Sequence, residues 1–274
     1  MSLALLRLFV ASWALHAGMS PWAPAQAISL KSSDGLAITA WLHHNGRMQP
    51  SSALLVIVPG FAQREGTASM NAVAGELSQE RDCLMVDLRG NGASAGRYTF
   101  GAEEWRDVDA ARFWAEARYA RIDVLGFSLG AYTALRSVAQ WPGHTHSLAL
   151  ASPPPSLERI VSSGGALLQP LCSPFQSALY AFPPGNDLLF RWGSIFGGHP
   201  SACGLASKVF IPAAVLVGAR DHLIFPSLSQ AVYASLAGPK SFTRMPQGLH
   251  AERMFLQDPS AFEAWLHQQA LDLP

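Results

Sequence analysis

Short apolar runs recur along the chain and predict the buried strands of a sheet. The runs occupy residues 53–58, 83–86, 122–125, 147–151 and 213–217. They show little polar alternation, which is typical of parallel strands because helices cover both faces of a parallel sheet. Nearer the N-terminus, Ile28–Lys31 and Leu36–Leu42 flank the turn dipeptide Asp34-Gly35 and predict a β-hairpin.

Helical periodicity fills the intervals between the runs. Apolar residues lie three, three and four positions apart at Trp105, Val108, Ala111 and Ala115. Further helices are predicted over residues 129–140, 226–236 and 260–270. For the last helix, Ser260 as N-cap and Glu263 three residues later match a capping box. This alternation of strand and helix predicts an α/β fold with a doubly wound, mostly parallel sheet.

One stretch, at about residues 153–208, departs from the alternation. It begins with Pro153-Pro154-Pro155 and contains Gly164-Gly165 and Gly197-Gly198. Long segments of this kind form functional lids or are disordered, and the high apolar content argues against disorder. We therefore expect a small, mainly helical cap over one end of the sheet. Its large apolar residues include Phe175, Tyr180, Phe182, Leu188, Leu189, Phe190, Trp192, Ile195 and Phe196.

Residues 1–27 are predicted to be a cleavable signal peptide. Arg7 precedes the apolar run 8–15, and Ala25-Gln26-Ala27 has the small-x-small pattern of a cleavage site. The run is shorter than the roughly 18–20 residues of a membrane-spanning helix, although an uncleaved anchor or a buried helix remains an alternative. We expect a secreted or periplasmic protein of residues 28–274, without stable membrane insertion once the signal is removed.

Composition and charge narrow the classes of partner. The chain has 274 residues, of which 49% are hydrophobic and 14% charged, which fits one large globular domain. Nineteen basic residues balance nineteen acidic ones, so no basic surplus favours nucleic acid. Of the three cysteines, Cys83 lies in an apolar run, whereas Cys172 and Cys203 form a disulfide or remain free thiols, and the sequence leaves this open.

The motif that carries chemistry is Gly126-Phe127-Ser128-Leu129-Gly130. It follows a predicted strand and opens a predicted helix, which is the context that a G-x-S-x-G nucleophile elbow requires. The turn is so sharp that side chains at residues 126 and 130 would collide with neighbouring backbone, which explains both glycines. It raises the Ser128 hydroxyl above the end of the strand and aims the Leu129 N–H at the site where an oxyanion forms.

With this motif in place, the chain from about residue 28 to its end resembles the serine hydrolases of the α/β-hydrolase superfamily. The stretch Asp87–Gly96 is similar to the D-x-R-G-x-G-x-S-x-G loop of many members, and we expect it to be structural. The resemblance implies about eight strands, with the cap inserted after the sixth.

The expected triad order is serine, acid, histidine. Asp221 follows the apolar run 213–217, and His250 lies on a loop after the next predicted strand. The spacing from Asp221 to Pro226 resembles the family pattern. By resemblance the second oxyanion N–H comes from Phe61, although Pro59 replaces the histidine that many members have before the glycine of this loop.

This constellation predicts acyl transfer through an acyl-enzyme intermediate, with Ser128 as nucleophile, His250 as base and Asp221 orienting the imidazole. An apolar cap favours a small-molecule ester with an apolar acyl or alcohol group. The alternatives are a thioesterase or serine peptidase with the same triad, or a non-catalytic protein that binds an apolar ligand. We expect no cofactor and no metal, because His43-His44 and His144-x-His146 lack a third ligand at suitable spacing. The oligomeric state is left open.

Overall fold

The computed structural model describes residues 25–45, 52–156, 159 and 199–267. Within them the strands form one sheet in the order β1-β2-β4-β3-β5-β6-β7-β8. β1 pairs with β2 and β2 with β4 in antiparallel fashion, and every other pairing is parallel. The strands are β1 (Gln26–Lys31), β2 (Ala37–His43), β3 (Ala53–Val58), β4 (Asp82–Val86), β5 (Arg121–Phe127), β6 (Thr145–Ala151), β7 (Ala213–Gly218) and β8 (Lys240–Met245).

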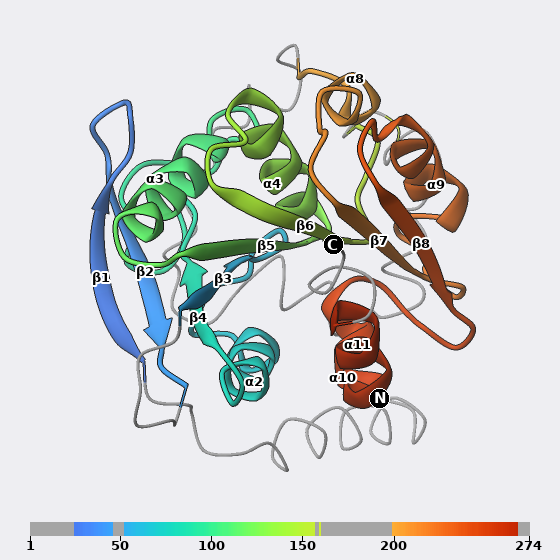
Figure 1. Ribbon diagram of the computed structural model, residues 1–274, viewed down its shortest axis with the longest axis horizontal. Helices are drawn as coiled ribbons and strands as arrows, with labels where there is room; N and C mark the ends of the chain where they lie inside the picture. The colour runs from blue at the N-terminus through green and yellow to red at the C-terminus, as the bar shows by residue number, and fades with distance from the viewer. Residues whose placement is uncertain (1–24, 46–51, 157–158, 160–198, 268–274) are drawn as a thin grey trace, which may run out of the picture.

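Helices cover both faces of this sheet, as the apolar runs predict (Figure 1). One face carries α3 (Trp105–Glu116), α4 (Leu129–Gln140), α8 (Ala202–Ala206) and α9 (Pro226–Ser235). The other face carries α2 (Ala68–Leu77), α10 (Glu252–Gln257) and α11 (Pro259–Trp265). Two apolar cores result, one on each side. Side chains of β3 alternate between them, with Leu54 and Val56 on one side and Leu55 and Ile57 on the other.

The predicted doubly wound, mostly parallel sheet is confirmed, and all five apolar runs are strands of it. The hairpin is confirmed as β1 and β2, with Gly35 at a φ of 90° in the turn. The capping box is wrong. Asp258 is the N-cap of α11, where its carboxylate accepts the Ala261 N–H at 3.0 Å, and Pro259 occupies the first turn. Proline suits that position because its missing N–H would have no intrahelical partner there.

Three predicted features fall largely on residues outside those described. They are the signal peptide up to residue 24, the cap over residues 160–198, and Cys172 of the possible disulfide. Within the predicted cap region, α8 is described and packs against α4 and α9, so Ala202, Leu205 and Ala206 share the main core. At the other end, Gln26 and Ala27 already pair with Leu42 and Trp41 in the hairpin. Of the described helices, none is long and apolar enough to cross a membrane.

Candidate active site

The turn between β5 and α4 places Ser128 above the sheet in a strained conformation. Its φ is 52° and its ψ is −121°, a region that residues with a side chain rarely adopt. A Cβ on Gly126 would lie 2.6 Å from Ala131 Cα, and a Cβ on Gly130 would lie 2.1 Å from the carbonyl oxygen of Pro59. Both glycines are therefore required by close backbone approach, as the motif predicts.

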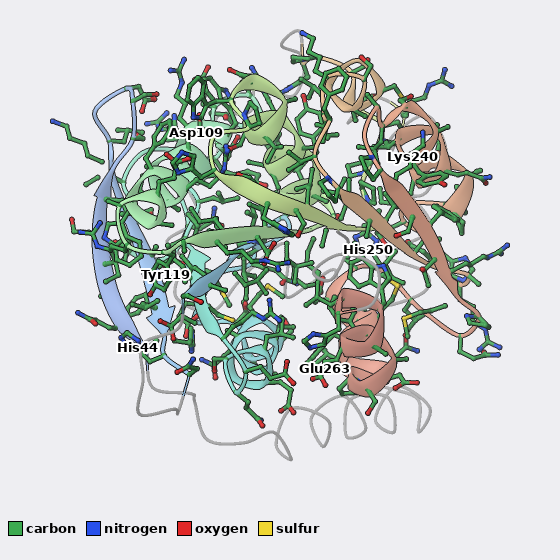
Figure 2. All side chains as sticks on the ribbon, viewed as in Figure 1. His44, Asp109, Tyr119, Lys240, His250 and Glu263 are labelled. Carbon is green, nitrogen blue, oxygen red and sulfur yellow. The ribbon has the colours of Figure 1, made fainter. Side chains whose placement is uncertain are left out.

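Ser128, His250 and Asp221 meet at the carboxyl ends of the parallel strands. His250 Nε2 lies 2.8 Å from Ser128 Oγ, and His250 Nδ1 lies 2.8 Å from Asp221 Oδ2. The sequence separations are 122 and 29 residues, so only the parallel sheet brings these side chains together. Figure 2 labels His250 near the middle of the molecule, beside β7 and the helices of the second face.

The surroundings of the pair favour a charged acid and a basic imidazole. The Asp221 side chain is fully buried, and its Oδ1 accepts the backbone N–H groups of Leu223 and Ile224 at 3.0 and 2.8 Å. Burial opposes the charge, but the charge and hydrogen bond of His250, together with the Ile224 N–H, hold the Asp221 pKa below its usual value. Burial also opposes charging of His250, yet the Asp221 carboxylate outweighs it and raises the histidine pKa. The imidazole is 15% exposed, so it reaches solvent.

The loop after β3 lies directly against the serine. A Cβ on Gly60 would be 3.5 Å from Ser128 Cβ and 3.3 Å from the Phe127 carbonyl oxygen. Phe61 follows and packs its ring on Tyr98 and Phe100, each with ring centroids 5.7 Å away. Leu129, the other predicted N–H donor, is the first residue of α4. The loop and the helix terminus thus flank the serine hydroxyl.

Comparison with known proteins agrees with this arrangement. A family model described as the alpha/beta hydrolase family matches residues 55–271. The chain belongs to the alpha/beta hydrolase family. The chain is also similar to a pimeloyl-[acyl-carrier protein] methyl ester esterase of Chromobacterium violaceum, with 29% identity over 210 residues, which are 65% of this chain and 80% of that protein.

Two solved esterases illustrate how widely this hydrolase fold is shared. The esterase Pf2001 of Pyrococcus furiosus has a TM-score of 0.71 and 20% identity, covering 91% of this chain and 93% of its own. A thermophilic esterase of Thermogutta terrifontis has a TM-score of 0.65 and 18% identity, covering 89% and 99%. At these identities the likeness shows the fold.

A buried polar network that the sequence analysis missed holds the β3 loop of this hydrolase. Gln63 Nε2 donates to Glu252 Oε1 at 2.5 Å, which ties the loop to the first residue of α10, two positions after His250. Glu65 accepts from Asn71 Nδ2 at 2.9 Å and lies 3.1 Å from His43 Nε2. His43, weighed above as a metal ligand, is therefore a partner of a buried carboxylate. These contacts brace the loop in a hydrolase that has Pro59 before its glycine.

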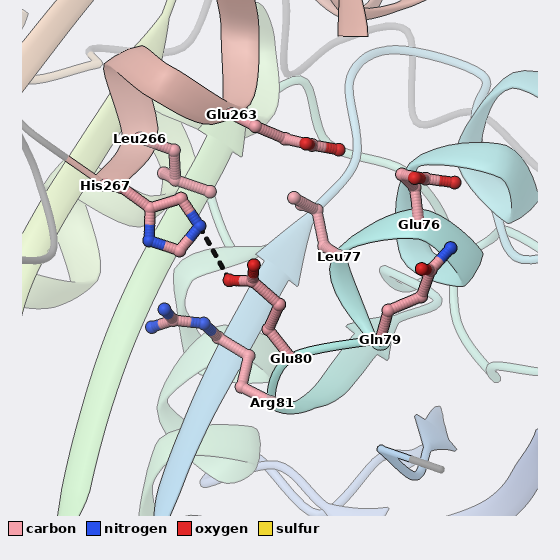
Figure 3. Close-up of a pocket in the computed structure, with 8 residues that line it drawn as sticks. All are labelled: Glu76, Leu77, Gln79, Glu80, Arg81, Glu263, Leu266 and His267. Atoms are coloured by element: carbon pink, nitrogen blue, oxygen red, sulfur yellow. Dashed lines mark ion pairs between the residues drawn. The ribbon is translucent and has the colours of Figure 1, made fainter. Parts of the chain in front are cut away.

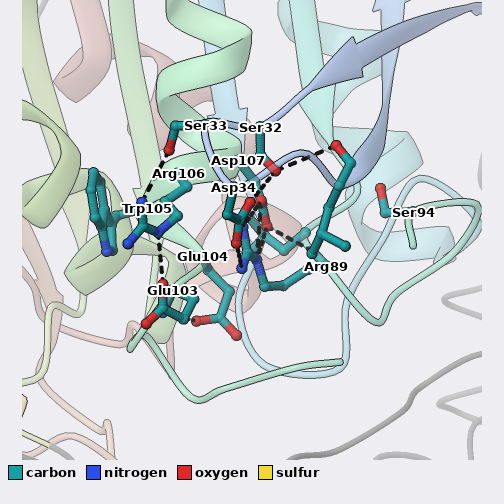
Figure 4. Close-up of polar contacts among 12 residues, drawn as sticks. Ser32, Ser33, Asp34, Arg89, Ser94, Glu103, Glu104, Trp105, Arg106 and Asp107 are labelled. Carbon is teal, nitrogen blue, oxygen red and sulfur yellow. Dashed lines mark hydrogen bonds and ion pairs between the residues drawn. The ribbon is translucent and has the colours of Figure 1, made fainter. Parts of the chain in front are cut away.

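The Asp87–Gly96 loop of the hydrolase has the contacts of a structural motif. Asp87 accepts from Trp41 Nε1 at 2.9 Å and from the Glu65 N–H at 3.0 Å. Arg89 bridges Asp34 and Asp107, each at 2.7 Å, which joins the hairpin to α3 (Figure 4). The hydrogen bond from Arg89 lowers the pKa of Asp34 to about 2.

A separate pocket, lined by none of the triad residues, lies between α2 and α11 (Figure 3). Its lining includes Glu76, Glu80 and Glu263, and His267 Nε2 forms a 2.7 Å ion pair with Glu80. Burial, followed by the charges of Glu76 and Glu80, raises the pKa of Glu263. The remaining histidines weighed as metal ligands also lie apart from the triad: His44 and His144 are exposed, and His146 lies 3.3 Å from Asp123.

Proposed function

We propose that the protein is a serine hydrolase that cleaves carboxylic esters through an acyl-enzyme intermediate. The observation that carries this proposal is the unbroken relay from Ser128 Oγ through His250 to Asp221, with both links at 2.8 Å. A relay of this geometry lets the histidine remove the serine proton during attack, which turns a weak nucleophile into a strong one.

In the proposed reaction His250 Nε2 accepts the Ser128 proton while Oγ bonds to the ester carbonyl carbon. The resulting oxyanion receives hydrogen bonds from the N–H groups of Phe61 and Leu129, and each such donor is worth about 10²- to 10³-fold in kcat. His250 then protonates the departing alcohol, and the acyl-enzyme forms. Water attacks this ester with His250 again as base, which releases the acid and restores Ser128.

Asp221 supports every step without exchanging a proton itself. Its Oδ2 accepts from Nδ1, so the lone pair of the neutral imidazole lies on Nε2 and faces Ser128. Leu223 and Ile224 N–H groups hold the other oxygen. The carboxylate therefore stabilises the imidazolium that forms in each half-reaction.

The proposed substrate is a small ester with an apolar acyl or alcohol group. Phe61 and Phe100 pack beside the serine loop with their rings stacked, which supplies apolar surface near the nucleophile. The Chromobacterium violaceum relative is named for methyl ester cleavage, which supports an ester substrate over a thioester or an amide. A thioesterase or a serine peptidase would use the same relay. A ligand-binding protein on the same fold would hydrolyse none of these substrates.

Covalent labelling combined with turnover tests the proposal. Wild type, Ser128→Ala and Ser227→Ala are treated with a fluorophosphonate and analysed by mass, and hydrolysis of p-nitrophenyl esters of graded chain length is followed. Ser227 is exposed on α9 and serves as the matched serine control. We expect one adduct and full activity in wild type and Ser227→Ala, and a loss of about 10⁶-fold in kcat for Ser128→Ala.

Three results contradict the proposal or redirect it. Labelling that survives Ser128→Ala removes Ser128 as nucleophile. If wild-type protein forms no adduct and hydrolyses no ester, the result indicates the non-catalytic ligand-binding protein. Faster cleavage of matched thioesters or amides assigns the thioesterase or peptidase alternative.

We also propose export through the N-terminal signal, with a mature chain that starts at Ile28. Arg7, the apolar run 8–15 and Ala25-Gln26-Ala27 support this proposal. Mass analysis of the exported protein is expected to show Ile28 as the first residue. A product that retains Met1 in the membrane fraction supports the anchor instead.

A further inference from the structure

The carboxyl end of β6 places a buried serine beside the triad. Ser152 follows the strand directly, as Ser128 follows β5, and Asp221 lies three residues past β7. It is fully buried and has a φ of 51°, so a residue with a side chain is held in a strained left-handed conformation. Such strain persists only where the surrounding structure enforces it, and it clusters at functional sites.

Hydrogen bonds link this strand end to the backbone that carries the triad. The Ser128 N–H donates to the Ala151 carbonyl oxygen at 2.8 Å, which fixes the nucleophile turn to β6. The Ser152 N–H donates to the Leu216 carbonyl oxygen at 2.8 Å, which fixes the serine to β7, the strand before Asp221. The position of Ser152 is therefore set by the same two strands that position the nucleophile and the acid.

The Ser152 hydroxyl meets the histidine turn. Its Oγ accepts the Ala251 N–H at 3.2 Å, and Ala251 directly follows His250. Ala251 is fully buried and has a φ of 48° and a ψ of −118°, nearly the conformation of Ser128. A buried N–H in such a turn needs an acceptor, because leaving it unpaired costs a full desolvation penalty.

The same residue is tied to the strand that leads to the acid. The Ser152 N–H bond to Leu216 anchors it to β7, and Asp221 lies three residues past the end of that strand. Burial raises the pKa of Asp221, but His250, the Ile224 N–H and the Ser152 side chain together lower it. Ser152 thus links the strand before the acid to the backbone of the histidine.

We propose that Ser152 is a positioning residue of the active site, whose hydroxyl holds the His250 turn in register with Asp221. The inference rests in part on the proposed function, because the effect on turnover requires a working triad. Ser152 does not touch the reacting atoms. It acts by fixing the ring that does.

The test compares Ser152→Ala and Ser152→Gly with the control Ser147→Ala. Ser147 is a buried serine of β6 whose hydroxyl donates to Asp123 at 2.7 Å, so it matches Ser152 in burial and in having a buried hydrogen bond. Glycine adopts a positive φ without strain, so Ser152→Gly keeps the fold even where alanine destabilises it. Kinetics are measured against a p-nitrophenyl ester across pH, with Tm for each variant.

Both Ser152 variants are expected to lower kcat about 10- to 100-fold at nearly constant KM, because they leave the buried Ala251 N–H of the histidine turn without its acceptor. The acid limb of kcat/KM is expected to move to lower pH, because an imidazole held less firmly beside Asp221 loses part of the charge interaction that raises its pKa. Ser147→Ala is expected to lower Tm while kcat and the limb stay unchanged. An unchanged kcat or an unmoved limb in Ser152→Gly overturns the proposal.

A second readout separates this proposal from the proposed function. The downfield NMR resonance of the His250 Nδ1 proton reports the bond to Asp221 without any turnover. It is recorded for Ser152→Gly and Ser147→Ala, each combined with Ser128→Ala. A displaced or exchange-broadened resonance in the Ser152 variant alone supports positioning, even for a protein that hydrolyses no ester. An identical resonance in both contradicts it.

Discussion

Gly130→Ala tests how tightly the proposed oxyanion site depends on backbone packing. The new Cβ would lie 2.1 Å from the Pro59 carbonyl oxygen and 2.4 Å from that of Val58, both backbone atoms at the end of β3. A carbon and an oxygen make ordinary contact at more than 3 Å, so α4 and the β3 loop must separate by roughly 1 Å. Overpacking of this kind lowers the free energy of unfolding by about 1–3 kcal/mol.

The same displacement acts on catalysis. Leu129 begins α4 and Phe61 lies on the β3 loop, so the separation moves the two proposed N–H donors apart. Oxyanion donors work at about 2.7–3.1 Å, and a misplacement of about 1 Å costs on the order of 10²-fold in rate. That factor corresponds to about 2.7 kcal/mol of transition-state stabilisation.

The assay measures kcat and KM with a short p-nitrophenyl ester, together with thermal unfolding. The control is Gly204→Ala in α8, where the added Cβ meets only the Ser201 hydroxyl at 3.1 Å and alanine favours the helix. We expect Gly130→Ala to lower both kcat and Tm, and the control to change neither by much. A Gly130→Ala protein with wild-type kcat refutes the argument, because the donors would then tolerate a shift that the packing demands.

Three further predictions concern charged groups. Because Asp221 raises the pKa of His250, kcat/KM should fall as pH drops through a value above the usual 6.5. Asp221→Asn should move this acid limb of the pH–rate profile to lower pH and reduce kcat. An acid limb that does not move contradicts the prediction. The same pKa shifts make the free energy of unfolding depend on pH. The stabilisation from Asp221 is present above its ordinary pKa of 3.8 and is lost as pH falls through the lowered pKa. The stabilisation from His250 is present below its ordinary pKa of 6.5 and is lost as pH rises through the raised pKa. Arg112 of α3 is fully buried and binds Asp109, Ser137 and the Trp141 carbonyl oxygen. Arg112→Met should therefore lower the free energy of unfolding by about 3–5 kcal/mol and Tm by about 10 °C. Calorimetry checks the loss, and KM should stay unchanged because the cluster lies away from the triad.

Much of the fold is readable in local sequence patterns. Uninterrupted apolar runs such as residues 53–58 are strands because no other element buries both faces over so few residues. The elbow is equally local, since Gly126 and Gly130 are demanded by a turn of five residues. The order of Ser128, Asp221 and His250 along the chain, each after a predicted strand, identified the residues that the sheet brings together.

Short helices were harder to predict, and one helix start was wrong. α10 has only six residues, too few to show a periodic face. At α11 both Asp258 and Ser260 are suitable N-caps by residue type, and Ser260 with Glu263 satisfies a local motif. Asp258 is used because the chain turns there directly out of α10, with its N–H still bonded to Met254.

The groups that hold the site in place could be found only in three dimensions. Gln63 and Glu252 lie 189 residues apart, and Ser152 and Ala251 lie 99 apart, so no spacing rule connects them. A buried hydrogen bond depends on which strand ends become neighbours, and neighbours in this sheet are not neighbours in the chain. The sequence by itself determined which side chains are candidates for the proposed chemistry, because that depends on residue type and local turns. The tertiary structure decided what orients them, because orientation comes from partners that folding selects.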